Sequence, residues 1–148
     1  MKKFSLIALG RRHLDTARRA TSGRSANTVF GGHEHVLRQT VIALTGEQEL
    51  SEHLNPGEAT IFVLHGRIRL STQDDRWEAR VGDLLVVPQG LYSVQAIENS
   101  AILLTVAKTD RQYQIPEQDV SAAEPQAQAE SQPVAVQEQQ NGVPVLSD

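Results

Sequence analysis

The stretch Gly82-Asp-Leu-Leu-Val-Val-Pro88-Gln-Gly90 decides the fold of this chain. A glycine, five residues and then Pro-x-Gly are typical of a strand entered by one tight turn and left by another. The reason is that glycine has unusual backbone freedom and proline unusual restraint. The continuous apolar run from Leu84 to Val87 predicts a strand buried in the middle of a barrel.

The segment upstream adds further strands and turns. Asn55-Pro56-Gly57-Glu58 is a strong turn signal after a strand at residues 48–55, and the strands 60–64 and 67–71 are expected to pair around His65-Gly66. Alternation in residues 48–55 does not settle which face is buried. Many short strands, with turns about every 8–12 residues, predict an all-β sandwich or barrel.

The strand expected at residues 35–44 has two possible orientations. One set of alternating residues contains His35, Gln39 and Val41, and the other contains Arg38 and Thr40. We expect Arg38 and Thr40 to face water, which turns His35 and Gln39 inward. If the strand is unbroken at its start, His33 shares the inward face.

Composition limits the class of protein. A chain of 148 residues corresponds to one domain. It has no cysteine, which excludes disulfides, thiolate ligands and thiol catalysis. No stretch approaches the roughly 20 apolar residues that a membrane span needs. The first ten residues imitate a signal peptide, but Arg11-Arg12 ends the apolar run, so we expect a mature N-terminus and a cytoplasmic protein.

Charge is divided unevenly along the chain. Residues 1–24 carry seven Lys/Arg and one acid, whereas residues 116–148 carry six acids and no base. The remaining body is close to neutral, which gives no electrostatic case for binding nucleic acid.

Three regions are expected. Residues 1–24 form an N-terminal arm with a short helix over residues 11–21, whose Leu14, Ala17 and Thr21 share one face and which Ser22-Gly23 ends. Residues 25–112 form the β-barrel. Residues 113–148, rich in Gln, Glu, Ala and Pro, are expected to be a disordered acidic tail.

Taken together, the two strand-turn blocks resemble the two signature motifs of the cupin family, small jelly-roll β-barrels that often hold a metal. Fitting the first motif to its closing Gly66 places its ligand positions on His53, Asn55 and Ala59. The second motif matches Gly82, Pro88 and Gly90, and its histidine falls on Ser93, or on Tyr92 if one residue is missing. Gly31-Gly-His-Glu-His35 and Pro56-Gly-Glu-Ala-Thr60 are similar to segments of small bacterial single-domain cupins.

The resemblance implies a degenerate metal site, because only one of its four ligand positions keeps the usual residue. Asn55 offers a neutral amide oxygen, Ala59 offers nothing, and Tyr92 or Ser93 binds a first-row metal poorly unless it is deprotonated. The alternative is a three-histidine set of His33, His35 and His53 holding iron, manganese, nickel or zinc.

For function we expect a small-molecule binding or sensing module that works as a homodimer without a catalytic metal, membrane or nucleic acid. The residues expected to line its pocket are His35, Gln39, His53, Asn55, Tyr92 and Ser93. Two alternatives stay open: a metal-dependent dioxygenase or isomerase that uses the histidines, and a structural or interaction protein with a solid barrel.

Overall fold

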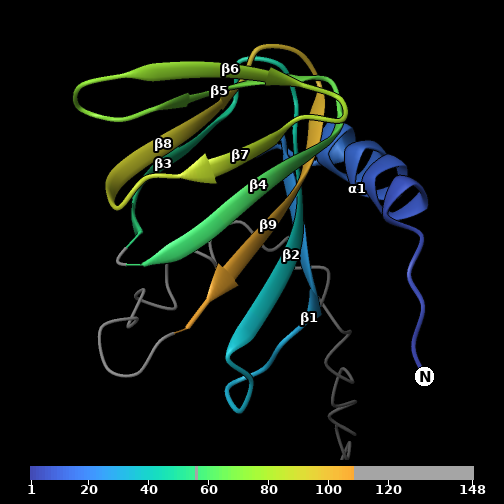
Figure 1. Cartoon of the computed structure of the whole chain (residues 1–148). Coiled ribbons are helices and arrows are strands. Elements are labelled where there is room, and N and C mark those ends of the chain that lie inside the picture. Colours follow the sequence, from blue (N-terminus) through green and yellow to red (C-terminus); the bar gives the residue numbers. More distant parts are fainter. Residues whose placement is uncertain (56, 109–148) are drawn as a thin grey trace, which may run out of the picture.

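The structure is a computed structural model that describes residues 1–55 and 57–108. Within these residues one helix precedes nine strands (Figure 1). The elements are α1 (Leu6–Arg19), β1 (Arg24–Phe30), β2 (Leu37–Leu44), β3 (Glu49–Asn55), β4 (Glu58–His65), β5 (Arg67–Ser71), β6 (Arg76–Arg80), β7 (Leu84–Val87), β8 (Gly90–Ala96) and β9 (Ser100–Ala107).

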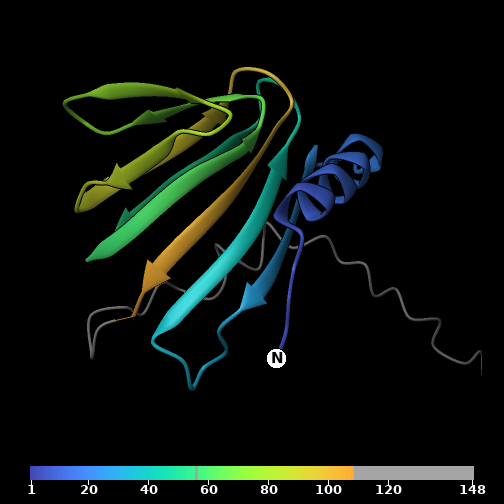
Figure 2. The same ribbon diagram turned by 45° about the vertical axis from the view of Figure 1, so that its right-hand side comes forward.

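The strands form two antiparallel sheets that face each other. The larger sheet has the order β1-β2-β9-β4-β7, and the smaller sheet has the order β3-β8-β5-β6. Figures 1 and 2 show the helix on the side of the larger sheet that is turned away from the smaller one. The described strands therefore build a jelly-roll sandwich of two sheets rather than one closed barrel, and the all-β, cupin-type prediction is confirmed.

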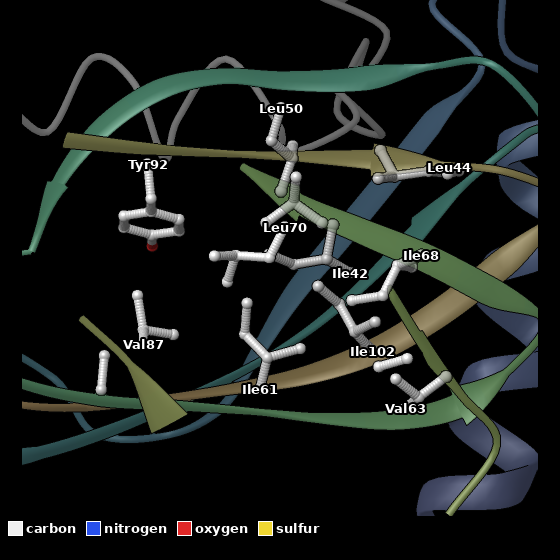
Figure 3. Packing of buried hydrophobic residues seen from close by; sticks show 14 of the residues in the cluster. Ile42, Leu44, Leu50, Ile61, Val63, Ile68, Leu70, Val87, Tyr92 and Ile102 are labelled. Atoms are coloured by element: carbon white, nitrogen blue, oxygen red, sulfur yellow. The ribbon is translucent and has the colours of Figure 1, made fainter. Parts of the chain in front are cut away.

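The main core lies between the inner faces, which the two sheets turn toward each other. Ile61 and Val63 of the larger sheet meet Ile68 and Leu70 of the smaller one, and all four side chains are buried (Figure 3). Burying aliphatic side chains of this size stabilises a fold by about 1.5–3 kcal/mol each. This core holds the two sheets together and places the ends of their strands.

A second core lies between α1 and the outer face of the larger sheet. Leu14 and Ala17 of the helix pack on Val41, Ala43 and neighbouring residues. This confirms the prediction that Leu14 and Ala17 share the packed face. The helix begins earlier than predicted, at Leu6, because the Ser5 side chain caps it by accepting a hydrogen bond from the Ala8 amide at 3.3 Å.

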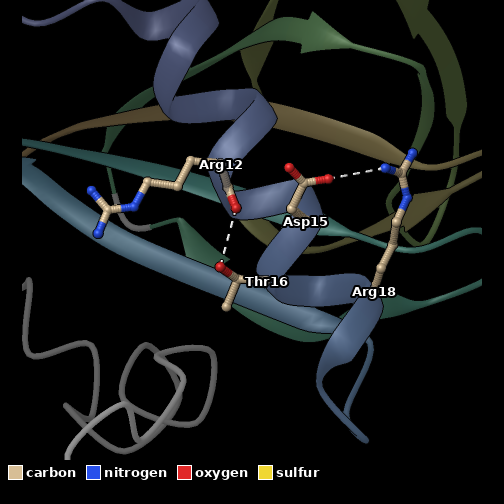
Figure 4. A network of polar contacts seen from close by, with 4 residues as sticks. All are labelled: Arg12, Asp15, Thr16 and Arg18. Carbon is tan, nitrogen blue, oxygen red and sulfur yellow. Dashed lines mark hydrogen bonds and ion pairs between the residues drawn. The ribbon is translucent and has the colours of Figure 1, made fainter.

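The exposed face of α1 carries its charged and polar side chains. Arg18 Nη1 lies 3.2 Å from Asp15 Oδ1, and the Thr16 hydroxyl donates to the Arg12 carbonyl at 3.1 Å (Figure 4). Both contacts are within one turn of the helix and exposed, so they contribute little to stability. This part of the helix is a solvated surface, as expected from its clustered arginines.

The predicted orientation of the strand at residues 35–44 is wrong. Thr40, Ile42 and Leu44 face the smaller sheet, whereas Val41 and Ala43 face the helix. Both faces of β2 are buried, so the rule that polar residues mark the solvent face fails here. The strand also begins at Leu37 instead of residue 35.

Three other predictions about strands are corrected. Strands β4 and β5 do not pair with each other, since the chain crosses from one sheet to the other at Gly66, where φ is 75°. Strand β7 is at an edge, and its Leu84 and Val86 are 60% and 77% exposed. Strand β1 was not predicted, because its residues are largely polar. The expected tail, residues 113–148, lies outside the described residues.

Candidate functional site

One end of the sandwich gathers all four ligand positions of the resembled motifs. Strand pairing sets His53 opposite Tyr92 and Ala59 opposite Val87, while Asn55 ends β3 opposite Gly90. We call this group the Tyr92 end and define it by inner-face residues: His53, Asn55, Ala59, Val87 and Tyr92. In Figure 3 the Tyr92 ring points from β8 toward Val87 on the other sheet.

A β-bulge explains why His53 and Asn55 point inward. Leu50 pairs with Val94 in the core, but the register shifts between Leu50 and His53. The extra residue reverses the alternation, so that even-numbered positions face inward before the bulge and odd-numbered positions after it. This is why alternation in the sequence could not settle the orientation of the strand.

His53 is partly buried at this end. Its Nδ1 hydrogen-bonds the main-chain carbonyl of Ser51, and its ring centre lies 6.2 Å from that of Tyr92. A carbonyl only accepts, so Nδ1 carries the proton and Nε2 is the acceptor in the neutral ring. His53 therefore presents one ring nitrogen that can accept a hydrogen bond from a ligand.

Asn55 is committed to the protein itself. Its amide nitrogen donates to the carbonyls of Val87 at 2.9 Å and Pro88 at 3.1 Å, and its side-chain oxygen accepts from the Gly57 amide at 3.3 Å. The side chain is 3% exposed. We predicted it as a ligand-binding residue, but these bonds make it a link between the turn after β3 and the turn after β7.

Tyr92 takes the fourth motif position. It is 8% exposed, and burial raises the pKa of its phenol to about 12. The phenol is therefore neutral at physiological pH. Its hydroxyl has no hydrogen-bond partner among residues 1–55 and 57–108, so it can donate to or accept from a bound molecule.

The residues at the Tyr92 end do not fit a metal ion. Of the four positions, only His53 supplies a good ligand, since the Asn55 amide is occupied, Ala59 has no donor and Tyr92 stays protonated. In the described part of the chain, no three His, Asp or Glu side chains lie close enough together to hold an ion. The alternative set of His33, His35 and His53 is thus not brought together.

The other predicted site residues lie elsewhere. His33 and His35 are exposed in the loop between β1 and β2, so the expected inward face for them is wrong. Ser93 is opposite Ser71 on the outer face of the smaller sheet, because it alternates with the inward Tyr92 and Val94. Neither His35 nor Ser93 adjoins the Tyr92 end.

Gln39 lies on the outer face of the larger sheet, where its amide nitrogen donates to the Thr105 hydroxyl at 3.3 Å. Together with His35 it lines a cavity of approximately 680 Å³ outside the sandwich. The other lining residues are Lys2, Phe4, Leu6, Val29, Phe30, Gly31 and Leu103. Two predicted ligand residues thus adjoin a cavity, but not the one expected.

Sequence reasoning missed Arg38, which lies on the inner face beside Thr28 and Thr40. Its alternation with Ile42 and Leu44 was visible, and so was the smaller size of Val41 and Ala43 on the opposite face. Small residues suit a face that a helix approaches closely, and larger ones suit the core between sheets. That difference in size was the signal that could have oriented the strand.

The comparisons with known proteins agree with this architecture. Residues 39–99 match the family model of the cupin domain. This chain carries a cupin domain. No curated protein matches the sequence significantly. No helix in the described part of the cupin chain is long and apolar enough to cross a membrane.

Solved structures resemble the cupin domain at low sequence identity. A conserved protein of unknown function from Streptococcus pyogenes is 25% identical, with a TM-score of 0.55, over 62% of this chain and 80% of that one. A cupin superfamily protein from Desulfitobacterium hafniense is 13% identical, with a TM-score of 0.54, over 58% and 78%. Salicylate 1,2-dioxygenase from Pseudoaminobacter salicylatoxidans, solved with gentisate, is 18% identical, with a TM-score of 0.57, over 66% and 31%. Identity this low shows the fold and not the activity.

Proposed function

We propose that this cupin domain binds a small organic molecule at the Tyr92 end without a resident metal. The observation that carries the proposal is the pair of inward side chains, His53 and Tyr92, which keep one acceptor and one hydroxyl for a ligand. Around them lie the apolar Ala59 and Val87. Apolar walls with a few convergent polar groups are the usual composition of a ligand site.

The substituted motif positions argue for binding rather than metal chemistry. The Asn55 amide links two turns, and Ala59 removes a carboxylate from the place where the family motif has one. A dioxygenase or isomerase mechanism through His33, His35 and His53 is not proposed, because the described residues do not gather them. We also place the protein in the cytoplasm.

The binding proposal is tested by purifying the full chain without chelator and measuring its metal content and bound organic molecules. We expect well under one equivalent of iron, manganese, nickel or zinc, and a co-purifying organic molecule in native mass spectrometry. About one tightly held metal per chain, lost in His53→Ala, would contradict the proposal. His65→Ala, an exposed histidine at a turn, is the matched control.

We further propose that the chain forms a homodimer. Support comes from β7, an edge strand whose outward Leu84 and Val86 are exposed to solvent, since exposed apolar edges tend to be covered by a second chain. Sedimentation equilibrium of the wild type and of Val86→Lys tests this. A wild type that stays monomeric at micromolar concentration would refute it.

A further inference from the structure

Arg38 lies at the same level of the sandwich as the Tyr92 end. Its strand partner is Val106, which pairs on its other side with Ala59, and Ala59 pairs with Val87. Directly paired residues point to the same face of a sheet. Arg38, Val106, Ala59 and Val87 therefore form one row across the inner face of the larger sheet, with the cation at one end and Tyr92 against the other.

The guanidinium of Arg38 is poorly satisfied by the protein. Its Nη2 donates to the Thr28 hydroxyl at 3.5 Å, at the outer limit for a hydrogen bond, and its Nε is buried without a partner among the described residues. The Thr28 hydroxyl is also 3.2 Å from that of Thr40. No carboxylate in the described part of the chain forms an ion pair with Arg38.

A partly buried cation in this state lacks the anion that such groups normally have. Leaving a buried donor unpaired costs free energy, and a guanidinium presents Nε and Nη2 as a fork that matches the two oxygens of a carboxylate. The long bond to Thr28 is weak enough for a carboxylate oxygen to replace it. The open donors lie on the inner face, at the level where the ligand is proposed to sit.

We propose that the molecule bound by this domain is an organic carboxylate, and that Arg38 recognises its carboxylate group. This inference rests on the proposed function and names the chemical class of its ligand. The apolar body of the ligand lies along Val106 and Ala59, and its far end reaches the hydroxyl of Tyr92. A neutral molecule of the same shape leaves the Nε of Arg38 unpaired and binds more weakly.

The test uses the full ¹⁵N-labelled chain and the side-chain Nε–H signals of its arginines. Benzoate and hexanoate are titrated beside their primary amides, benzamide and hexanamide. We expect the acids to shift the Arg38 Nε–H signal and the main-chain signals around Tyr92, with affinities at least about tenfold above those of the amides. Inorganic phosphate is titrated separately to detect a general anion site.

Variants assign the effect to Arg38. Arg38→Gln is expected to lower the affinity for the acids at least about tenfold and to leave that for the amides unchanged, and Arg38→Lys is expected to be intermediate. Arg24→Gln is the matched control, because Arg24 also has a buried, unpartnered Nε but lies at the other end of β1, opposite Leu44. Its removal should not change binding.

Each outcome separates the two proposals. Equal binding of acids and amides near Tyr92, or unchanged acid binding by Arg38→Gln, overturns the carboxylate assignment and leaves the binding function standing. Phosphate binding as tightly as the organic acids also overturns it. If no probe shifts signals at the Tyr92 end, the proposed function itself fails. If Arg38→Gln does not fold, Arg38→Lys and the comparison of acids with amides still decide.

Discussion

Asn55 donates a hydrogen bond from its side-chain amide to the main-chain carbonyl of Val87, 2.9 Å away on the opposite sheet. The same nitrogen reaches the carbonyl of Pro88, and the side-chain oxygen receives the Gly57 amide. One buried side chain thus joins two turns that are more than thirty residues apart in the chain. At a position where the resembled family places a metal ligand, this chain has a structural hydrogen-bonding group.

Asn55→Ala is therefore expected to destabilise the fold by about 1–3 kcal/mol, because it leaves buried carbonyls without donors. Urea unfolding followed by circular dichroism measures the change. Asn27→Ala is the matched control, since Asn27 is exposed on β1, and should stay within about 0.5 kcal/mol. Equal losses in the two variants would show that the bonds at Asn55 contribute nothing.

The phenol of Tyr92 should titrate late. Burial raises its pKa to about 12, above the ordinary value of 10.0. The unfolded chain releases this proton first, so stability is expected to fall as the pH rises from about 10 toward 12. Absorbance at the wavelength of tyrosinate should show a component near pH 12 that Tyr92→Phe removes. A wild type and a Tyr92→Phe variant with identical titrations would refute this assignment.

His13 gives the fold a pH dependence on the acid side. Its Nδ1 lies 2.7 Å from the hydroxyl of buried Ser25, and its pKa is lowered by burial and by the neighbouring Arg12. With a folded pKa below the unfolded value of 6.5, the contribution of His13 is present above pH 6.5 and lost as the pH falls.

The unfolding free energy is thus expected to decrease between about pH 7.5 and about pH 5.5, and His13→Gln should reduce that decrease. The lowered pKa values of the Glu34 and Glu78 carboxyls act only below their ordinary 4.5, outside this range. Denaturant unfolding at the two pH values measures the effect. A decrease as large in the variant as in the wild type would assign it to other groups.

The motif glycines should differ in their tolerance of alanine. Gly66 has φ 75°, and a Cβ there would clash with the carbonyl oxygen of Asn99. Gly82 has φ 91°, but a Cβ at this position would meet no atom within 4 Å. Gly82→Ala should cost only the backbone strain of about 1–2 kcal/mol, and Gly66→Ala clearly more. Thermal unfolding of the pair tests this, and equal melting temperatures would contradict it.

The sequence predicted the fold well because its turns are encoded locally. Gly82 and Gly90 have positive φ at the two ends of the stretch that predicted β7, so the residues that marked the turns are those whose backbone requires glycine. The bounds of β5 and β7 were predicted correctly for the same reason. Residues around Gly66 were also assigned to the right strands, although not to the right sheets.

The site was harder to predict because the direction of a side chain depends on distant elements. The bulge before His53 changes the alternation of β3, and helix α1 buries the face of β2 that would otherwise meet solvent. Neither effect is visible within the strand concerned. As a result, Gln39 was placed inward and Arg38 outward, the reverse of the structure.

The position of β9 limits how this protein can be shortened. This strand pairs with β2 on one side and β4 on the other, yet all of it lies after residue 99, where the family match ends. A fragment trimmed to residues 39–99 would lose the middle strand of the five-stranded sheet and the helix behind it, and its exposed edges would favour aggregation. Expression of the domain alone therefore has to include both flanking segments.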